Sequence, residues 1–198
     1  MAAVDAALRS GYAASDTEAD WLVRSMARAE LRIGLPDKAI VTHTIVKVRQ
    51  EPKEAKAGIP YIGNVAYREF VHFAGDLSAA FNLTTLSARL AETLVALMPL
   101  VTYFGKRGSF VQYLGVERLL ELDTRFTLPL DQLETIPQGV HFAMLDDFGP
   151  EANFDALNSY SRTPIKRDKH RTFTQTVVPL GLVRSGPGFS EYRRFGEV

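Results

Sequence analysis

The sequence lacks cysteine, has no net charge and contains no long apolar run. The absence of cysteine among 198 residues excludes disulfides and thiolate metal sites, and it fits a reducing compartment. No stretch reaches the roughly 18 apolar residues of a membrane-spanning helix. The N-terminal stretch contains Asp5 and Arg9 and has no apolar segment of the kind a secretory signal needs. We therefore expect a cytoplasmic protein that does not enter a membrane.

The charges balance in number but are unevenly distributed along the chain. There are 23 Lys and Arg residues and 23 Asp and Glu residues, so the chain has no global basic field. This weakens the case for nucleic-acid binding without excluding it, because the distribution of charge matters more than its sum. Residues 162–171 hold five Lys or Arg residues and one His against a single Asp, whereas acidic residues gather at 117–134 and 146–155. The basic stretch is a candidate phosphate-binding segment.

Sequence motifs for common catalytic sites are missing. The segment 105–109 lacks the spacing of a P-loop, and there is no G-x-S-x-G nucleophile motif. The four histidines never occur three or four residues apart, so a metal site would have to be assembled from distant segments. We therefore expect no resident metal or cofactor.

The hydrophobic periodicity predicts one α+β domain spanning residues 1–198. A capping box at 15–18 begins a helix, and leucines at near-helical spacing predict a second one. Alternating, β-branched stretches predict an antiparallel sheet with the two helices on one face. The predicted helices are 16–32 and 84–98, and the predicted strands are 38–50, 61–75, 77–83, 109–115, 139–145, 171–185 and 189–195, with a short helical turn within 150–160.

The strands 38–50 and 61–75 predict a long hairpin with a basic tip, about residues 43–68. Its cations could contact phosphates while its rings stack on unpaired bases. Three glutamates dilute the charge, so a solvated protruding hairpin is an equally good interpretation. The cations are Lys47, Arg49, Lys53 and Lys56, and the rings are Tyr61, Tyr67 and Phe70.

A second candidate contact is the turn Gly105-Lys106-Arg107-Gly108, which lies between two apolar runs. Glycine permits close approach of another backbone, and the two cations could neutralise a phosphodiester. The alternative interpretation is a hairpin turn with solvated basic residues.

The basic stretch near the C-terminus offers a third candidate contact. It contributes Lys166, Arg167, Lys169, His170 and Arg171. Metal-independent RNA cleavage needs a base near the 2′-hydroxyl and a cation for the developing charge, and His170 among its basic neighbours could supply both. Simple phosphate contact or solvated charge explains the same residues.

The order of these segments resembles a known family. The runs "AIVTHTIVKVRQEP", "IPYIGNVAYREFVHFAGDLSAAFNL", "VTYFGKRGSFVQYLG" and "RTFTQTVVPLGLVRSG" with "EYRRF", over roughly residues 16–195, are similar to the Cas family-five subunit of type I CRISPR surveillance complexes. That family belongs to the RAMP superfamily, which is built on a ferredoxin-like, RRM-related fold. The resemblance implies that residues 43–68 form a thumb hairpin carrying the four hairpin cations, and that Lys106 and Arg107 lie in the family's glycine turn.

The resemblance also implies partners and raises one conflict. It implies binding of the 5′ handle of CRISPR RNA at one end of a complex with a repeating backbone subunit and a large subunit, and indirect contact with target DNA. The ferredoxin-like plan begins with a strand, but this chain shows none before its first predicted helix, so the first strand is missing. A partner could supply it, or the sheet could be rearranged. Some family members also cleave the RNA.

We expect a non-catalytic RNA-binding subunit that grips single-stranded RNA. The alternatives are a metal-independent endoribonuclease with His170 as its base, and an interaction module unrelated to RNA. The expected RNA contacts are Lys47, Arg49, Lys53, Lys56, Lys106, Arg107, Lys166, Arg167, Lys169, His170 and Arg171.

Overall fold

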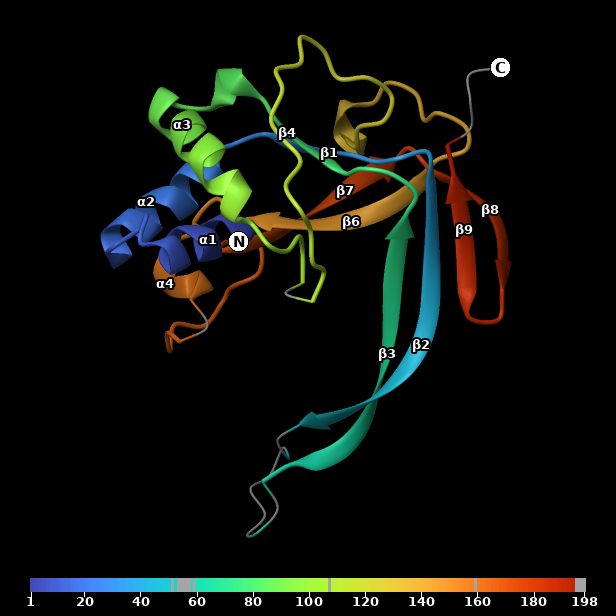
Figure 1. The fold of residues 1–198 in the computed structure, drawn as a ribbon, viewed down its shortest axis with the longest axis horizontal. Coiled ribbons are helices and arrows are strands. Elements are labelled where there is room, and N and C mark those ends of the chain that lie inside the picture. Colours follow the sequence, from blue (N-terminus) through green and yellow to red (C-terminus); the bar gives the residue numbers. More distant parts are fainter. Residues whose placement is uncertain (51, 53–57, 59, 107, 159, 195–198) are drawn as a thin grey trace.

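The computed structural model describes residues 1–50, 52, 58, 60–106, 108–158 and 160–194. Within them the chain forms helices and strands in mixed order (Figure 1). The helices are α1 (Ala2–Ser10), α2 (Asp16–Met26), α3 (Ala88–Leu97) and α4 (Phe154–Leu157), with single 3-10 turns at Leu83–Thr85, Met98–Leu100 and Leu130–Gln132. The strands are β1 (Leu31–Gly34), β2 (Lys38–Gln50), β3 (Ile62–Phe73), β4 (Ser78–Phe81), β5 (Leu128–Pro129), β6 (His141–Phe148), β7 (Arg171–Val178), β8 (Gly181–Gly186) and β9 (Phe189–Arg193).

The four helices pack together around the larger apolar core. Its buried side chains come from α1, α2, α3 and α4, among them Val4, Leu22, Leu90 and Leu97. α1 was not predicted, and its small apolar side chains pack inside this cluster. The helix ends at Gly11, whose φ of 75° is a left-handed conformation that glycine adopts without strain. Residues 2–10 therefore add no strand to any sheet, in agreement with the strand missing from the sequence pattern.

Two predicted helices are shorter than expected. The hydroxyl of Ser15 accepts from the backbone N–H of Glu18, as the capping box predicts, but α2 ends at Met26 instead of 32. The chain then enters β1. In the second helix the hydroxyl of Ser87 caps the N-terminus, so α3 begins at residue 88 after a single 3-10 turn.

The strands form three antiparallel sheets, and the fold is α+β. β1 pairs with β4, the order β3-β2-β9-β8 makes a four-stranded sheet, and β5-β7-β6 makes a three-stranded one. The long β2–β3 hairpin lies where the sequence predicted it and is continuously paired from Ala39 opposite Phe73 to Gln50 opposite Ile62. A smaller apolar cluster around Leu35, Ala39 and Leu180 holds the base of this sheet to the rest of the chain.

Two predicted strands were wrong. Residues 109–115 form no strand, and only Phe110 makes an isolated bridge with Tyr103. The predicted strand 171–185 is two strands in different sheets, because the chain turns at Pro179 and Leu180. Proline cannot donate a ladder hydrogen bond, which explains the break at this point.

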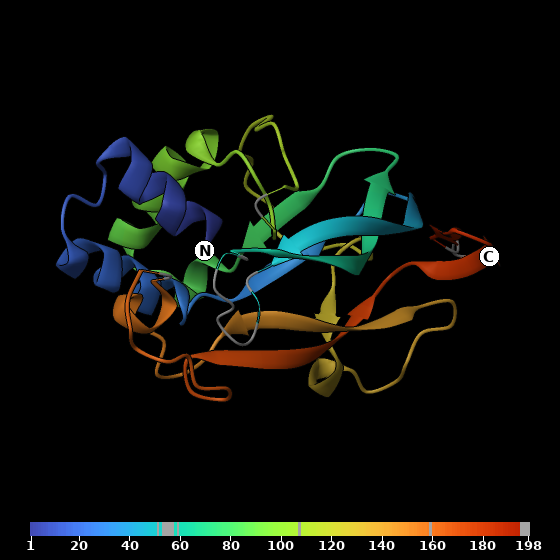
Figure 2. The same cartoon turned by 90° about the horizontal axis from the view of Figure 1, so that it is seen from below.

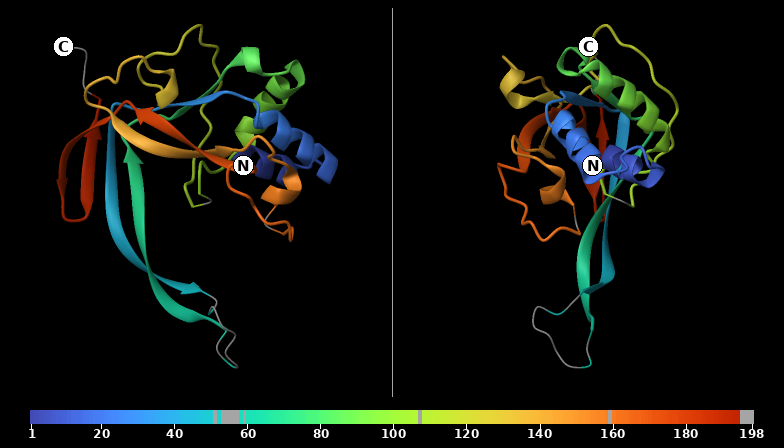
Figure 3. Two further views of the ribbon diagram at one scale, coloured as in Figure 1. Left: turned by 180° about the vertical axis from the view of Figure 1, so that it is seen from behind. Right: turned by 90° about the vertical axis from the view of Figure 1, so that its left-hand side faces the viewer.

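The hairpin extends away from the body in Figures 1 and 3. In Figure 1 and in the left view of Figure 3 it curves back beneath the helices, and in the right view of Figure 3 it extends below them. Seen from below in Figure 2, β6 and β7 run together on one side of the molecule and β2 and β3 on the other. Across the part of the chain that the structure describes, no helix is long and apolar enough to cross a membrane.

Candidate nucleic-acid interface

The strand register divides the hairpin into two faces of different chemistry. Odd-numbered residues of β2 pair with odd-numbered residues of β3, and side chains alternate along each strand. The odd-numbered side chains of β2 and β3 form one face, which we call the Tyr67 face. The even-numbered side chains of these strands, together with the residues opposite them on β9 and β8, form the Phe70 face.

The Tyr67 face combines cations and a ring near the far end of the hairpin. Lys47 and Arg49 are exposed on β2, and the Tyr67 side chain is 61% exposed on β3. The ring of His43 stacks on Tyr67 with centroids 5.9 Å apart, and its Nε2 lies 3.3 Å from the hydroxyl oxygen of Ser190 on β9. Tyr67 is therefore held from one side by His43, while much of its surface remains open for stacking on a base.

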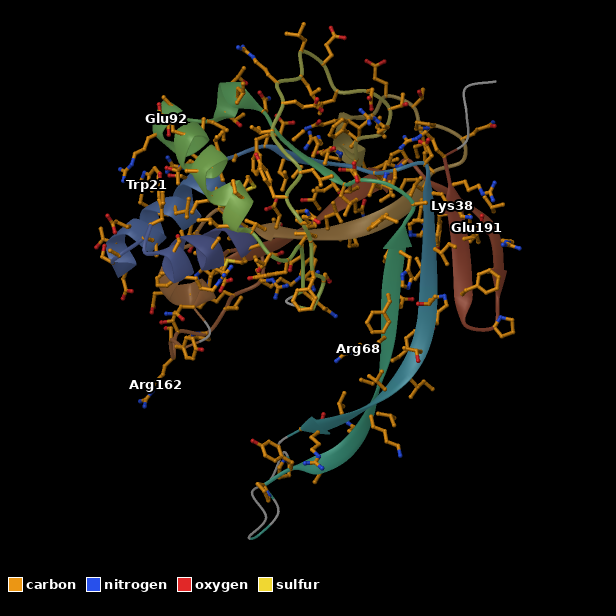
Figure 4. The ribbon with its side chains drawn as sticks, in the orientation of Figure 1. Trp21, Lys38, Arg68, Glu92, Arg162 and Glu191 are labelled. Carbon is orange, nitrogen blue, oxygen red and sulfur yellow. The ribbon has the colours of Figure 1, made fainter. Side chains whose placement is uncertain are left out.

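The predicted rings do not share one face. Phe70 lies on the opposite face from Tyr67, next to Arg68, which extends from β3 in Figure 4. Tyr61 is exposed just before β3 begins. Lys53 and Lys56, two of the predicted phosphate contacts, lie outside the described residues. Of the four predicted hairpin cations, the structure thus places Lys47 and Arg49 on one face with Tyr67.

The backbone hydrogen bonds around the glycine turn are those of a hairpin turn. The N–H of Ser109 donates to the carbonyl of Lys106 at 2.9 Å, and the N–H of Phe104 donates to the carbonyl of Ser109 at 3.0 Å. Gly105 has a φ of 78°, and this left-handed conformation explains the need for glycine there. Lys106 is exposed, whereas Arg107 lies outside the described residues. In Figure 1 the yellow-green chain on either side of this turn projects from the body on the side from which the β2–β3 hairpin extends.

Neighbouring acids neutralise much of the basic segment before β7. Lys169 Nζ lies 2.9 Å from Glu151 Oε1, and this hydrogen bond holds the pKa of Glu151 below its ordinary value. Arg171 Nε donates to Asp146 at 2.8 Å, and that bond raises the pKa of Arg171. These pairs leave less charge available for a phosphate than the sequence suggested.

The two other predicted cations of the segment, Lys166 and Arg167, are exposed. Arg167 Nε lies 3.9 Å from Asp168 Oδ1, and its guanidinium lies 5.0 Å from the ring centroid of Phe173. Lys166 is exposed, and no ion pair of its ammonium is found within the described residues. Both could still contact phosphate.

His170 is buried and hydrogen-bonded within its own loop. Its side chain is buried, and its Nδ1 accepts from the backbone N–H of Lys166 at 3.1 Å. The backbone N–H of His170 donates to the carbonyl of Lys166 at 2.9 Å. Nδ1 is thus engaged within the loop. Tyr160, which lies near His170 in the sequence, is almost fully exposed. A general base must come within hydrogen-bond reach of its substrate, and burial of His170 works against that role.

The structure reveals a cationic cluster that the sequence analysis missed. Glu191 on β9 has a side chain only 1% exposed, and three cations surround its carboxylate. Figure 4 labels Glu191 and one of these cations, Lys38. Arg184 Nε donates at 2.6 Å, Arg193 Nε donates at 2.7 Å and Lys38 Nζ lies at 3.4 Å. The hydrogen bonds from Arg184 and Arg193 outweigh desolvation and lower the pKa of Glu191 to about 2.

Part of this cluster could have been found from the sequence. The predicted turn at 186–188 places Arg184 near Glu191 on the paired strands, and Arg193 lies two residues further on the same face. Lys38 could not have been placed there, because only the pairing of β2 with β9 brings it opposite Arg193. In the part of the chain that is described, no group of three His, Asp or Glu residues could hold a metal ion.

Comparison with known proteins found no match. No protein-family model, no curated protein and no solved structure matches the chain. The functional argument therefore depends on the residues themselves.

Proposed function

We propose that this chain is an RNA-binding subunit of a type I CRISPR surveillance complex, similar to the Cas family-five subunit. The observation that carries the proposal is the β2–β3 hairpin, which stands away from the body with Lys47, Arg49 and Tyr67 on one face. Cations that contact phosphates and a ring that stacks on a base are the elements of single-strand recognition. The ligand is the 5′ handle of CRISPR RNA.

The fold is compatible with this proposal. The proposal includes the ferredoxin-like, RRM-related arrangement expected from the sequence. The antiparallel pairing of the strands in the three sheets supports that arrangement. The β2–β3 hairpin is the element we propose as the family's thumb, although two helices and not one precede it here. The separation of the strands into three sheets is this chain's own departure from that plan.

Exposed apolar side chains support assembly into a complex. The stretch that follows the glycine turn carries Phe110, which is 84% exposed, and Leu120, which is 95% exposed, with Leu114 and Val116 between them. Several strongly exposed apolar side chains on one segment fit a protein–protein contact. The proposed partners are the repeating backbone subunit and the large subunit, with target DNA contacted indirectly through the RNA.

We favour binding over cleavage. The burial of His170 and the hydrogen bond that its Nδ1 accepts from the backbone N–H of Lys166 speak against the endoribonuclease alternative, which needs His170 as its base. Retention of RNA by the hairpin needs no such group.

The test is the salt dependence of RNA retention by a hairpin variant. Lys47→Ala with Arg49→Ala should weaken retention of a labelled single-stranded RNA. It should also reduce the slope of log affinity against log salt by about 1.4, because each lost phosphate contact on a single strand contributes about 0.7. The matched control is Arg28→Ala with Arg118→Ala, which removes two exposed arginines elsewhere. An unchanged slope in a folded hairpin variant would contradict the proposal and favour the alternative interpretation, a solvated protruding hairpin.

A further inference from the structure

The cluster around Glu191 contains more positive charge than its carboxylate requires. Lys38, Arg184 and Arg193 surround one buried carboxylate, and three cations against one anion leave a net charge of two positive units. A single bidentate arginine can satisfy both oxygens of a carboxylate. The excess charge therefore calls for an explanation beyond the neutralisation of Glu191.

The two arginines are held in place but remain accessible. The side chains of Arg184 and Arg193 are 66% and 54% exposed, although Arg184 is anchored to Glu191 through Nε and Arg193 through Nε and one Nη nitrogen. No hydrogen bond from the Nη nitrogens of Arg184 is found within the described residues. Glu191 thus fixes the orientation of the Arg184 guanidinium while most of that side chain remains exposed. A guanidinium fork fixed in this way matches two oxygens of a phosphate.

Aromatic rings lie in the next row of the same face. The register places Phe189 opposite Thr42, and Thr42 opposite Phe70, so both rings share the Phe70 face with Glu191. The guanidinium of Arg184 lies 5.7 Å from the ring centroid of Phe189. Phe70 is exposed, and Arg68 precedes it by two residues on the same face of β3. Rings beside cations fit a strand with bases as well as phosphates, which an isolated phosphate or an acidic peptide does not offer.

We infer that the Glu191 cluster on the Phe70 face is a second binding site, which takes a phosphodiester of single-stranded RNA. This inference rests on the proposed function, because it assigns the same ligand class to the side of the sheet opposite the Tyr67 face. Arg184 and Arg193 contact the phosphate, Lys38 adds charge, and Phe70 stacks on a neighbouring base. Glu191 is a positioning residue that touches no ligand.

The experiment measures the salt dependence of binding of a labelled oligo-uridine strand to the full chain. Arg184→Gln should lower the slope of log affinity against log salt by about 0.7, since one contact to a single strand is lost. Arg184→Lys should keep most of the slope, because it preserves the charge. Arg118→Gln, which changes an exposed arginine on another segment, is the matched control and should behave as the unmodified protein. If Arg184→Gln does not fold, Arg193→Gln replaces it with the same expectation.

The outcomes separate this inference from the proposed function when the hairpin variant is measured in parallel. A lower slope for Arg184→Gln and not for Arg118→Gln supports the second site. An unchanged slope for Arg184→Gln, with a lower slope for Lys47→Ala with Arg49→Ala, overturns the second site and leaves the hairpin as the RNA contact. A lower slope for Arg184→Gln, with an unchanged slope for Lys47→Ala with Arg49→Ala, supports the second site and overturns the hairpin as an RNA contact. No binding of the oligonucleotide by the unmodified chain overturns both.

Discussion

Glu191 has a carboxylate that is almost inaccessible and yet ionised. Burial of an isolated carboxylate is costly, and such a group is retained only when it is paired and hydrogen-bonded. Here Arg184 and Arg193 donate to it, and Lys38 lies close by. The charge of Glu191 therefore contributes to the stability of the four-stranded sheet as well as orienting the arginines.

The environment of Glu191 predicts a defined pH dependence of stability. Its folded-state pKa of about 2 lies below the ordinary value of 4.5, so the stabilisation is fully present above 4.5 and is lost as the pH falls from 4.5 toward 2. Glu191→Gln removes this contribution. We expect the variant to have the lower melting temperature at neutral pH, and the difference to shrink as the pH is lowered through that window.

Thermal unfolding at a series of pH values checks this expectation. Glu117→Gln is the matched control, because Glu117 is an exposed carboxylate outside the sheets and its substitution should leave the pH profile unchanged. A constant difference between Glu191→Gln and the unmodified protein across the whole pH series would show that the charge of Glu191 does not carry the effect.

At the scale of elements, the sequence predicted best where one local signal dominates. The β2–β3 hairpin follows from two alternating, β-branched stretches with a polar segment between them, and the structure has both strands within two residues of the predicted ends. α4 and the turn between β8 and β9 also lie where the sequence placed them. These elements need no distant partner to be recognised.

The wrong predictions share a different physical origin. α1 is short and alanine-rich, and its place in the fold depends on packing against α2 and α3. The stretch 109–115 alternates like a strand but finds no partner strand, so its pattern does not produce a ladder. The three-sheet arrangement likewise depends on which strands meet, and pairings such as β2 with β9 join residues far apart in the sequence.

The helical core offers a matched test at the same scale. Leu97 on α3 is fully buried in the apolar cluster, whereas Val95 on the same helix is exposed. Leu97→Ala should lower the free energy of unfolding by about 2–5 kcal/mol, because it removes packed atoms and leaves a cavity. Val95→Ala should change it by less than about 0.5 kcal/mol.

Urea unfolding of the two variants measures this difference directly. Equal destabilisation by Leu97→Ala and Val95→Ala would mean that α3 does not pack on α1 and α2 as described. A large effect of Leu97→Ala alone supports the helical layer as the body from which the hairpin extends.

At the scale of the whole molecule, the neutral net charge and the exposed apolar side chains belong together. A protein that finds RNA alone benefits from a strong basic field, which this chain lacks. A subunit among partners needs local cations and apolar contact surface, and both are present on the hairpin and around Phe110 and Leu120. These two features support the proposal that the molecule is a component of an assembly with RNA contacts on a projecting hairpin.

The most direct test of this account is incubation of the purified chain with labelled CRISPR repeat RNA in the presence of EDTA, followed by separate measurement of retention and RNA length. We predict retention of the RNA at full length, because we propose that the exposed hairpin cations bind phosphates and because the burial of His170 works against a role as base. Shortened RNA would contradict the non-catalytic role and favour the endoribonuclease alternative. Failure to retain the RNA at low salt would contradict the central claim that this chain is an RNA-binding subunit.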